Sequence, residues 1–252
     1  MSYFIVFAGK GGTGKSTLAA LTVRYLKEKG LSPILAVDAD PNFCLPELLK
    51  IPSFETLAEV REKALQDKRE GISLDDWLEL EINRIIEESE GFDLLVMGRP
   101  EGSGCYCAIN NILKRILQDL SKNYRYIVVD NEAGMEHISR GIVNKIDLLF
   151  VVGTQAKSSI EAALRINELI KQLDINGKKG KFSEGKKILL INQATDLIEK
   201  PEKLNIEFEK VLYVNFDENV RKMSEKGESI FSLPSDSPVI ERFFKLLEEE
   251  IG

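Results

Sequence analysis

The stretch that decides the fold is "YFIVFAGKGGTGKST", residues 3–17, in which a short apolar run ends in a glycine-rich loop. The loop, "GKGGTGKS" at 9–16, fits the pattern G-x-x-x-x-G-K-[ST]. Helical spacing follows it at Leu18, Leu21 and Leu26. The stretch therefore predicts a phosphate-binding loop between the first strand and the first helix of an α/β domain.

The glycines of this loop matter because phosphate oxygens need several hydrogen-bond donors close together, and a glycine-rich backbone can bend until its N–H groups converge on them. We expect Lys15 to reach the β and γ phosphates and the Ser16 hydroxyl to bind Mg²⁺. The predicted cofactors are ATP or ADP with Mg²⁺, and the predicted binding residues in the loop are Gly9, Lys10, Gly11, Gly12, Thr13, Gly14, Lys15, Ser16 and Thr17.

Short apolar runs alternate with amphipathic helical spacing along the rest of the chain. Nearly continuous apolarity predicts strands that are covered on both faces. The predicted strands lie at 3–8, 33–40, 92–98, 124–131, 147–153, 187–193 and 211–217. This order predicts an α/β fold with a doubly wound, mostly parallel sheet flanked by helices, which binds ligands at the carboxyl ends of its strands.

The chain length of 252 residues suits a single α/β domain spanning 1–252. A charged insertion at about 53–91 carries two helical patterns, "ETLAEVREKALQDKREG" at 55–71 and "LDDWLELEINRIIEESEG" at 74–91. We interpret the insertion as a solvated helical excursion, and a partner-docking arm is the alternative.

Charge and hydropathy exclude several classes of partner. The 34 Lys and Arg residues against 41 Asp and Glu residues give a net charge of −7, which argues against a general nucleic-acid binder. The N-terminal apolar run lacks the basic start of a signal peptide, and no apolar run approaches the roughly 18 residues that span a bilayer. We therefore expect a cytoplasmic protein with reduced thiols and with neither a membrane nor a nucleic acid as partner.

Two of the three cysteines stand close together in "GSGCYC" at 102–107, just before a predicted helix. Cys105 and Cys107 can direct both sulfurs toward one ion, and the positive end of the helix favours their thiolate form. They supply two ligands, whereas Zn²⁺ and thiolate-bound Ni²⁺ take four. We interpret Cys44 as a small core residue and His137 as a packed or capping residue, so that neither completes the site.

Symmetry can supply the missing ligands, because a twofold axis beside Cys105 and Cys107 would bring two such pairs together in a homodimer. A disulfide between the two residues, or unreacted thiols, is the competing interpretation. A disulfide between residues i and i+2 closes a small strained ring. Metal binding is therefore the interpretation that we carry forward.

The additional lysine in "KGGTGKS" at 10–16 resembles the deviant Walker A motif of the MinD, ParA and nitrogenase iron-protein group of P-loop ATPases. The resemblance implies that Lys10 reaches the nucleotide of a second subunit, so that ATP controls dimerisation. The segment "VDADP" at 37–41 looks like switch I of this group. This similarity implies that Asp40 orients the attacking water and Asp38 supports the metal shell, with Lys10, Lys15 and Asp40 as catalytic residues.

Further site residues follow from the same resemblance. In "IVVDNEAG" at 127–134, Asp130 corresponds to the Walker B carboxylate, which holds Mg²⁺ through water, and Gly134 lets switch II move. The side-chain amide of Asn192 is expected to read adenine. The segment "VNFDENV" at 214–220 is expected to complete the base pocket, with Asp217 as a weaker candidate. An ordinary turn residue is the alternative role of both Asn192 and Asp217.

The resemblance narrows when five segments are taken in order: "DADPNFCL" at 38–45, "GSGCYC" at 102–107, "VVDNEAGMEHISRG" at 128–141, "LLINQ" at 189–193 and "KGESIF" at 226–231. The same order occurs in the CooC proteins, ATPases that help insert nickel into carbon monoxide dehydrogenase. The resemblance implies a homodimer that binds Ni²⁺ or Zn²⁺ through both cysteine pairs. It also implies that hydrolysis of ATP to ADP and phosphate is coupled to metal delivery to carbon monoxide dehydrogenase or a related nickel enzyme.

Two other functions remain alternatives. An iron-protein-like reductase with an intersubunit [4Fe-4S] cluster places its two cluster cysteines far apart in sequence, unlike the pair found in this chain. A spatial-organising ATPase of the MinD or ParA kind needs a basic membrane helix or a DNA-binding surface. The last helical pattern, at 238–251, ends in three glutamates, so we interpret its apolar stripe as core packing; the stripe consists of Val239, Ile240, Phe243, Leu246 and Leu247.

Overall fold

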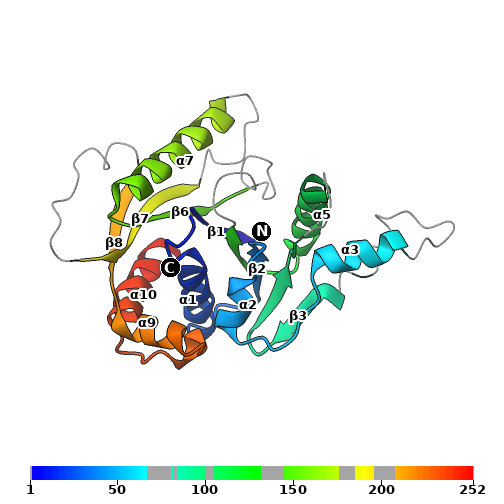
Figure 1. The fold of residues 1–252 in the computed structure, drawn as a ribbon, viewed down its shortest axis with the longest axis horizontal. Coiled ribbons are helices and arrows are strands. Elements are labelled where there is room, and N and C mark those ends of the chain that lie inside the picture. The colour runs from blue at the N-terminus through cyan, green and yellow to red at the C-terminus, as the bar shows by residue number, and fades with distance from the viewer. Residues whose placement is uncertain are drawn as a thin grey trace.

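The computed structural model describes residues 2–66, 81, 84–99, 105–131, 145–175, 185–195 and 208–251, without the side chains of 105–108 and 173–175. Within these residues the strands form one eight-stranded sheet in the order β3-β4-β2-β5-β1-β6-β7-β8 (Figure 1). The strands are β1 (Tyr3–Gly9), β2 (Ile34–Ala39), β3 (Ile86–Ser89), β4 (Phe92–Val96), β5 (Tyr126–Asn131), β6 (Leu148–Gly153), β7 (Lys186–Ala194) and β8 (Lys210–Asn215).

The pairing of the strands confirms the predicted fold class. β3 pairs with β4 in antiparallel fashion, and every other neighbouring pair is parallel. β1 lies in the interior of the sheet, with Ile5 opposite Val128 of β5 and Leu148 of β6. All seven predicted strands are present, and their carboxyl ends share one edge because the strands run in the same direction.

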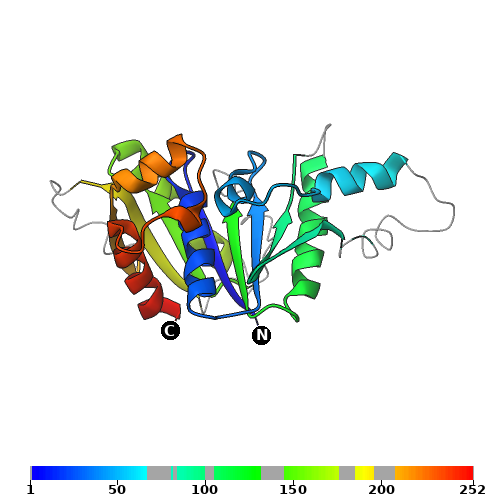
Figure 2. The same cartoon turned by 90° about the horizontal axis from the view of Figure 1, so that it is seen from below.

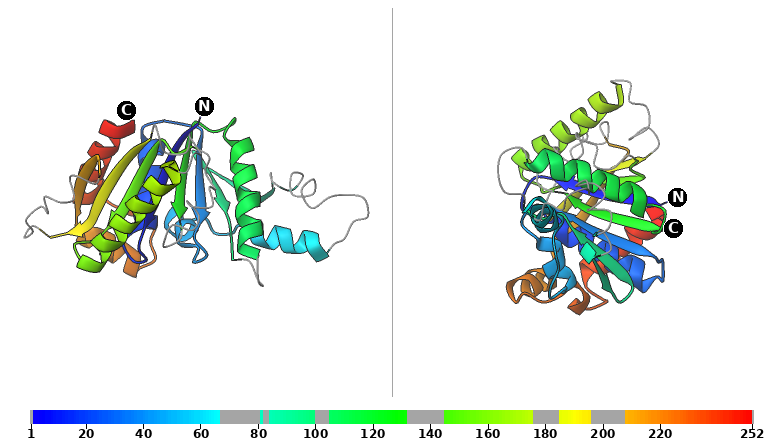
Figure 3. Two further views of the ribbon diagram at one scale, coloured as in Figure 1. Left: turned by 90° about the horizontal axis from the view of Figure 1, so that it is seen from above. Right: turned by 90° about the vertical axis from the view of Figure 1, so that its right-hand side faces the viewer.

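Helices cover both faces of the sheet (Figures 2 and 3). One face packs against α3 (Leu57–Gln66), α5 (Cys105–Leu120) and α7 (Lys157–Ile175). The other packs against α1 (Lys15–Glu28), α2 (Cys44–Leu49), α9 (Glu218–Glu225), the 3₁₀ helix η1 (Ile230–Ser232) and α10 (Pro238–Ile251). Coverage on both sides explains why the central strands are apolar at nearly every position.

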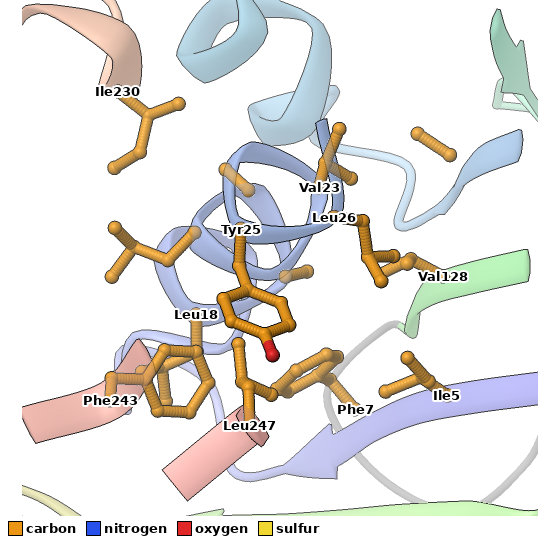
Figure 4. Close-up of a cluster of buried hydrophobic side chains, with 14 of the residues drawn as sticks. Ile5, Phe7, Leu18, Val23, Tyr25, Leu26, Val128, Ile230, Phe243 and Leu247 are labelled. Carbon is orange, nitrogen blue, oxygen red and sulfur yellow. The ribbon is translucent and has the colours of Figure 1, made fainter. Parts of the chain in front are cut away.

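Helix α1 is the centre of the second of these cores (Figure 4). Tyr25 is buried at 2% exposure, and the ring of Phe243 on α10 is fully buried in the same cluster. Arg24 on α1 is also buried, and its Nη1 atom donates hydrogen bonds of 2.8 and 2.9 Å to the carbonyls of Ile230 and Leu233. These contacts hold in place the helix that follows the phosphate-binding loop.

Helix α10 has the core role expected from its pattern, because all five residues of its apolar stripe are buried. Its acidic end pairs with strand residues: the Glu250 carboxylate lies 3.0 Å from the Lys186 ammonium and 2.8 Å from the Lys210 ammonium. None of the described helices combines the length and apolar character that a membrane crossing requires.

The insertion at 53–91 is not the solvated helical excursion that its charge predicted, because part of it packs into the core. Leu57, Ala58 and Val60 of α3 are buried in the core beneath the sheet, although Leu65 near the end of the helix is exposed. The second helical pattern is also wrong in its last part, where 86–89 forms β3 and turns back into β4. As a strand, β3 forms hydrogen bonds with the backbone groups along the outer side of β4, which a helix would have left unpaired. This gain outweighs the local helical pattern.

We predict that Phe243→Ala lowers the free energy of unfolding by about 3–5 kcal/mol, because it leaves a cavity between α10, α1 and β6. Arg242→Ala, an exposed neighbour on the same helix, should change it by less than about 0.5 kcal/mol. Urea denaturation followed by circular dichroism measures both values. Equal stability of the two variants would contradict the core role of α10.

Candidate functional site

The phosphate-binding loop connects the end of β1 at Gly9 with the start of α1 at Lys15. Gly14 caps α1 with a φ of 88°, a left-handed conformation that a residue with a side chain adopts only with strain. A Cβ atom at Gly14 would also lie 2.3 Å from the side-chain nitrogen of Asn192. The glycine is therefore required by the backbone and by its neighbour.

The two lysines of the loop point in different directions. Lys15 is buried, and its ammonium lies 3.4 Å from the Lys10 carbonyl, which also accepts a 2.9 Å hydrogen bond from the Thr13 hydroxyl. Lys10 is exposed, and its ammonium lies 3.3 Å from the Ser158 hydroxyl at the start of α7. Lys15 is thus placed inside the curl of the loop, whereas the Lys10 side chain extends toward α7, and its role toward a second subunit stays a prediction.

Two adjoining cavities lie at the carboxyl edge of the sheet. The larger, of about 830 Å³, is lined by loop residues 11, 12 and 14–17 and by residues of α2, including Cys44. The smaller, of about 290 Å³, is lined by residues of β7, β8 and α9, among them Asn192, and by Phe216 and Asp217 between β8 and α9. Gly14 and Thr17 border both cavities. The arrangement suits a ligand with phosphates at the loop and a ring system beyond it.

Asp130 is the buried acid of this site. It has no exposed surface, and neither of its carboxylate oxygens accepts a hydrogen bond of good geometry from the described residues. Burial raises the pKa of Asp130 to about 7, although the nearby Ser16 hydroxyl and Lys15 ammonium act to lower it. A buried carboxylate without a partner next to Ser16 fits a Mg²⁺ site, since the ion and its water molecules would satisfy the oxygens.

Asp38 lies directly opposite Asp130 in the parallel register of β2 and β5. Its carboxylate accepts hydrogen bonds of 2.9 and 3.0 Å from the backbone N–H groups of Asp40 and Leu45. Burial raises the pKa of Asp38 to about 8, and the charge of Asp130 is the next largest cause. The two hydrogen bonds act in the opposite direction but are outweighed. Asp38 thus shapes the loop after β2, and its support of a metal shell stays a prediction.

Asp40 faces the larger cavity, where a water-orienting residue would have to be. One of its oxygens accepts hydrogen bonds from the backbone and side-chain nitrogens of Asn42, at 2.9 and 2.7 Å. Sequence reasoning did not single out Asn42, although an asparagine two residues after an aspartate is a common turn partner. The catalytic role of Asp40 stays a prediction.

Asp217 is the N-cap of α9. One carboxylate oxygen accepts a 2.8 Å bond from the Asn219 N–H, and the other accepts bonds from the Ser237 hydroxyl and the Val239 N–H. Burial acts to raise the pKa of Asp217, but these hydrogen bonds outweigh it and the pKa is lowered. The turn-forming alternative describes this geometry, and contact of Asp217 with a base stays a prediction.

Sequence reasoning assigned the segment 214–220 to the base pocket without singling out Phe216, and it missed Gln193. Phe216 is 49% exposed and borders the smaller cavity, where its ring offers a flat apolar surface. Gln193 borders both cavities and adopts a φ of 55°. The aromatic residue between Asn215, which ends β8, and Asp217 was a usable signal for Phe216, whereas nothing local predicts the backbone of Gln193.

Cys44 is a correction to the prediction of a core residue. It is half-buried and lines the larger cavity, with a pKa raised first by burial and then by the charge of Asp40. The reason is the geometry of α2, which buries Leu45 and Leu49 against α1 and leaves Cys44 toward the cavity.

The remaining predicted residues are placed only in part. Gly134 and His137 lie outside the described residues, as do the side chains of Cys105 and Cys107. The backbone shows that α5 begins at Cys105. Among the residues that the structure describes, no group of three or more His, Cys, Asp or Glu side chains could hold a metal ion.

Known proteins share the sequence features of this nucleotide site. A sequence profile described as the CobQ/CobB/MinD/ParA nucleotide binding domain matches residues 4–230. The chain belongs to this family. It is therefore a P-loop ATPase, and nucleotide binding is the function shared by the family.

Similar proteins cover most of the chain. The uncharacterized ATP-binding protein MJ0685 of Methanocaldococcus jannaschii is 35% identical over 253 residues, covering 98% of each chain. The carbon monoxide dehydrogenase accessory protein CooC of Rhodospirillum rubrum is 30% identical over 185 residues, covering 68% of this chain and 70% of CooC. The septum site-determining protein MinD of Pyrococcus horikoshii, solved with Mg-ADP, superposes with a TM-score of 0.71 at 19% identity, covering 99% and 96% of the two chains.

We predict that Asp130→Asn stabilises the nucleotide-free protein. The folded pKa of Asp130 lies above its unfolded value of about 4, so its ionisation removes stability as the pH rises from about 4 through about 7. At pH 8 the variant should unfold with a free energy higher by about 1–3 kcal/mol and should lose the stabilisation that Mg²⁺ and ADP give the wild type.

Asp236→Asn, which changes an exposed acid, is the control and should alter neither quantity. Thermal unfolding between pH 5 and pH 8, with and without Mg²⁺ and ADP, measures both effects. The assignment is wrong if Asp130→Asn keeps the full stabilisation by Mg²⁺ and ADP.

Proposed function

We propose that this protein is an ATP-hydrolysing metallochaperone. In a homodimer that depends on nucleotide, Cys105 and Cys107 of both subunits bind Ni²⁺ or Zn²⁺ as cargo, and ATP turnover delivers nickel to carbon monoxide dehydrogenase or a related enzyme. The observation that carries the proposal is the position of the cysteine pair in a chain that resembles CooC: the pair starts α5 at the edge of the sheet where the nucleotide site lies.

The contacts made after the carboxyl end of α5 show at which edge of the sheet each end of the helix lies. After the helix ends at Leu120, the carbonyl of Tyr124 accepts a 2.5 Å hydrogen bond from the Ser2 hydroxyl, and the Arg125 N–H donates to Pro33 before β2. The carboxyl end of α5 therefore lies at the amino edge of the sheet, and the amino end of the helix lies at the opposite edge (Figure 2). A partner that covers this opposite edge would meet both the nucleotide and the cysteines.

Coordination chemistry explains why the two sites would act together. One chain offers two adjacent thiolates, and a four-coordinate ion needs two more donors. A ligand that favours the dimer raises the affinity for every other ligand that needs the dimer, because the linkage is reciprocal. ATP binding would thereby favour metal binding, and hydrolysis would weaken the hold on the metal.

The residues of this chain have separate tasks in hydrolysis. Lys15 lies inside the loop, where it would bind the β and γ phosphates. Ser16 and Asp130, which lie next to each other, would hold Mg²⁺, which would neutralise phosphate charge. Asp40 faces the cavity in which water would attack. Lys10 points away from its own loop and is the residue available to a second nucleotide.

Changing both Cys105 and Cys107 to Ser should weaken Ni²⁺ and Zn²⁺ binding by more than about 100-fold. Loss of a residue that only supports a metal ligand typically costs about 10–100-fold in affinity, and this change removes the ligands themselves. ATP binding should be unchanged. Cys44→Ser is the matched control, since Cys44 is the third cysteine of the chain and should leave metal affinity intact. Isothermal titration of purified thiol-reduced protein measures the affinities.

Unchanged metal affinity in the double variant would reject the cysteine site. Protein purified without oxygen that is brown and holds about four irons per dimer would support an iron-protein-like reductase instead. The similarity to MinD structures at 19% identity shows the fold alone, and burial of the α10 stripe leaves that helix no apolar face for a membrane.

Lys10→Ala should prevent the dimer from forming with a non-hydrolysable ATP analogue and should lower ATP hydrolysis by about tenfold or more, because a cation donated across an interface stabilises transferring phosphate. Nucleotide affinity of the monomer should change by less than about threefold. Lys157→Ala, a nearby exposed lysine, is the control. Sedimentation velocity measures the dimer, and equal dimerisation of wild type and Lys10→Ala would contradict the role of Lys10.

A further inference from the structure

Asn192 makes a contact that requires no nucleotide. Its side-chain Nδ2 atom donates a buried 2.9 Å hydrogen bond to the backbone carbonyl of Thr13 in the phosphate-binding loop. The side chain is 8% exposed and comes from the end of β7, 179 residues away along the chain. The bond therefore ties the loop to a strand two positions away from β1 in the sheet.

The backbone on both sides of this contact departs from regular structure. Gln193 has a φ of 55°, and the register between β7 and β8 shifts between Ile191 and Ala194. On the other side, Gly14 leaves room for the amide nitrogen, which would lie 2.3 Å from a Cβ atom at that position. Strained backbone persists only where the surrounding structure holds it in place. Here the irregular backbone lies on both sides of the hydrogen bond between Asn192 and Thr13.

The bond also determines which way the amide faces. Because the Thr13 carbonyl can only accept, the amino group of Asn192 must point to the loop. No hydrogen bond to the amide oxygen is formed within the described part of the chain. The residue borders the smaller cavity together with Asn215 and Phe216, so this oxygen is the acceptor that it can offer to a ligand there.

We propose that Asn192 is a positioning residue of the phosphate-binding loop in addition to any contact with the base. The amide holds the Thr13 carbonyl and so keeps the loop N–H groups converged on the phosphates. The loop in turn keeps the amide oxygen turned toward the base cavity, where an acceptor suits a 6-amino purine and opposes a 6-oxo purine. The proposal rests on the nucleotide site and not on metal delivery.

A ligand with phosphates and no base separates the two roles. We expect Asn192→Ala to weaken the binding of Mg²⁺-tripolyphosphate by about 3–10-fold, the range for loss of one buried hydrogen bond. Phe216→Ala is the matched control, because Phe216 borders the base cavity: it should weaken ATP and leave tripolyphosphate unchanged. Isothermal titration measures both ligands, with ATP and GTP compared in parallel.

Unchanged tripolyphosphate affinity in Asn192→Ala would overturn the proposal and leave Asn192 with a role at the base alone. An unchanged preference for ATP over GTP would overturn the part that concerns the amide oxygen. Asn192→Asp, which keeps the size of the side chain but cannot donate, guards against misfolding as the cause. In the nucleotide-free protein its amide hydrogen exchange over residues 10–16 should be faster than in wild type, and equal exchange would also reject the positioning role.

Those measurements use no transition metal. They remain decisive if Cys105 and Cys107 bind no nickel, and a failure of the metal-binding test leaves them untouched. A melting temperature of Asn192→Ala close to that of wild type, together with weaker tripolyphosphate binding, would show that the residue acts on the loop and not on the stability of the whole domain.

Discussion

The constraint on which the site depends is the parallel register of the central strands. Asp130 on β5 lies opposite Phe7 of β1 on one side and Asp38 of β2 on the other, and Gly9 lies opposite Val152 of β6. Because parallel strands end at the same edge, this register brings the phosphate-binding loop and two acids together. A shift of one residue would turn each acid to the opposite face of the sheet.

Much of the local strain of the described chain is gathered around this edge. Two carboxylates are buried close together, and Phe43 and Gln193 adopt left-handed backbone conformations beside the cavities. Such features cost stability in the protein without its ligands. The packing of α1 against the sheet, α10 and η1 offsets this cost, and Arg24 ties the same helix to the chain around η1. A rigid core thus supports a site that is completed by a charged ligand.

Different parts of the chain carry the family membership and the proposed function. The loop, its buried acids and the sheet account for nucleotide binding, which the chain shares with the proteins of its family. What would separate it from most of them is the cysteine pair at the start of α5. Nucleotide chemistry and metal chemistry would then meet at one surface, and a second copy of the chain would connect them.

The sequence by itself determined the α/β class, the seven main strands, the phosphate-binding loop and the core stripe of α10, because each depends on a few neighbouring residues with a fixed spacing. The tertiary structure decided that 86–89 pairs as a strand, that Cys44 faces the cavity and that Asp217 caps a helix. It also decided that Asn192 holds the loop at Thr13. The Asn192 bond joins residues 179 positions apart. The β3–β4 hairpin and the Asp217 cap are local contacts, but which of the possible local structures forms is decided by strand pairing and packing in the folded domain.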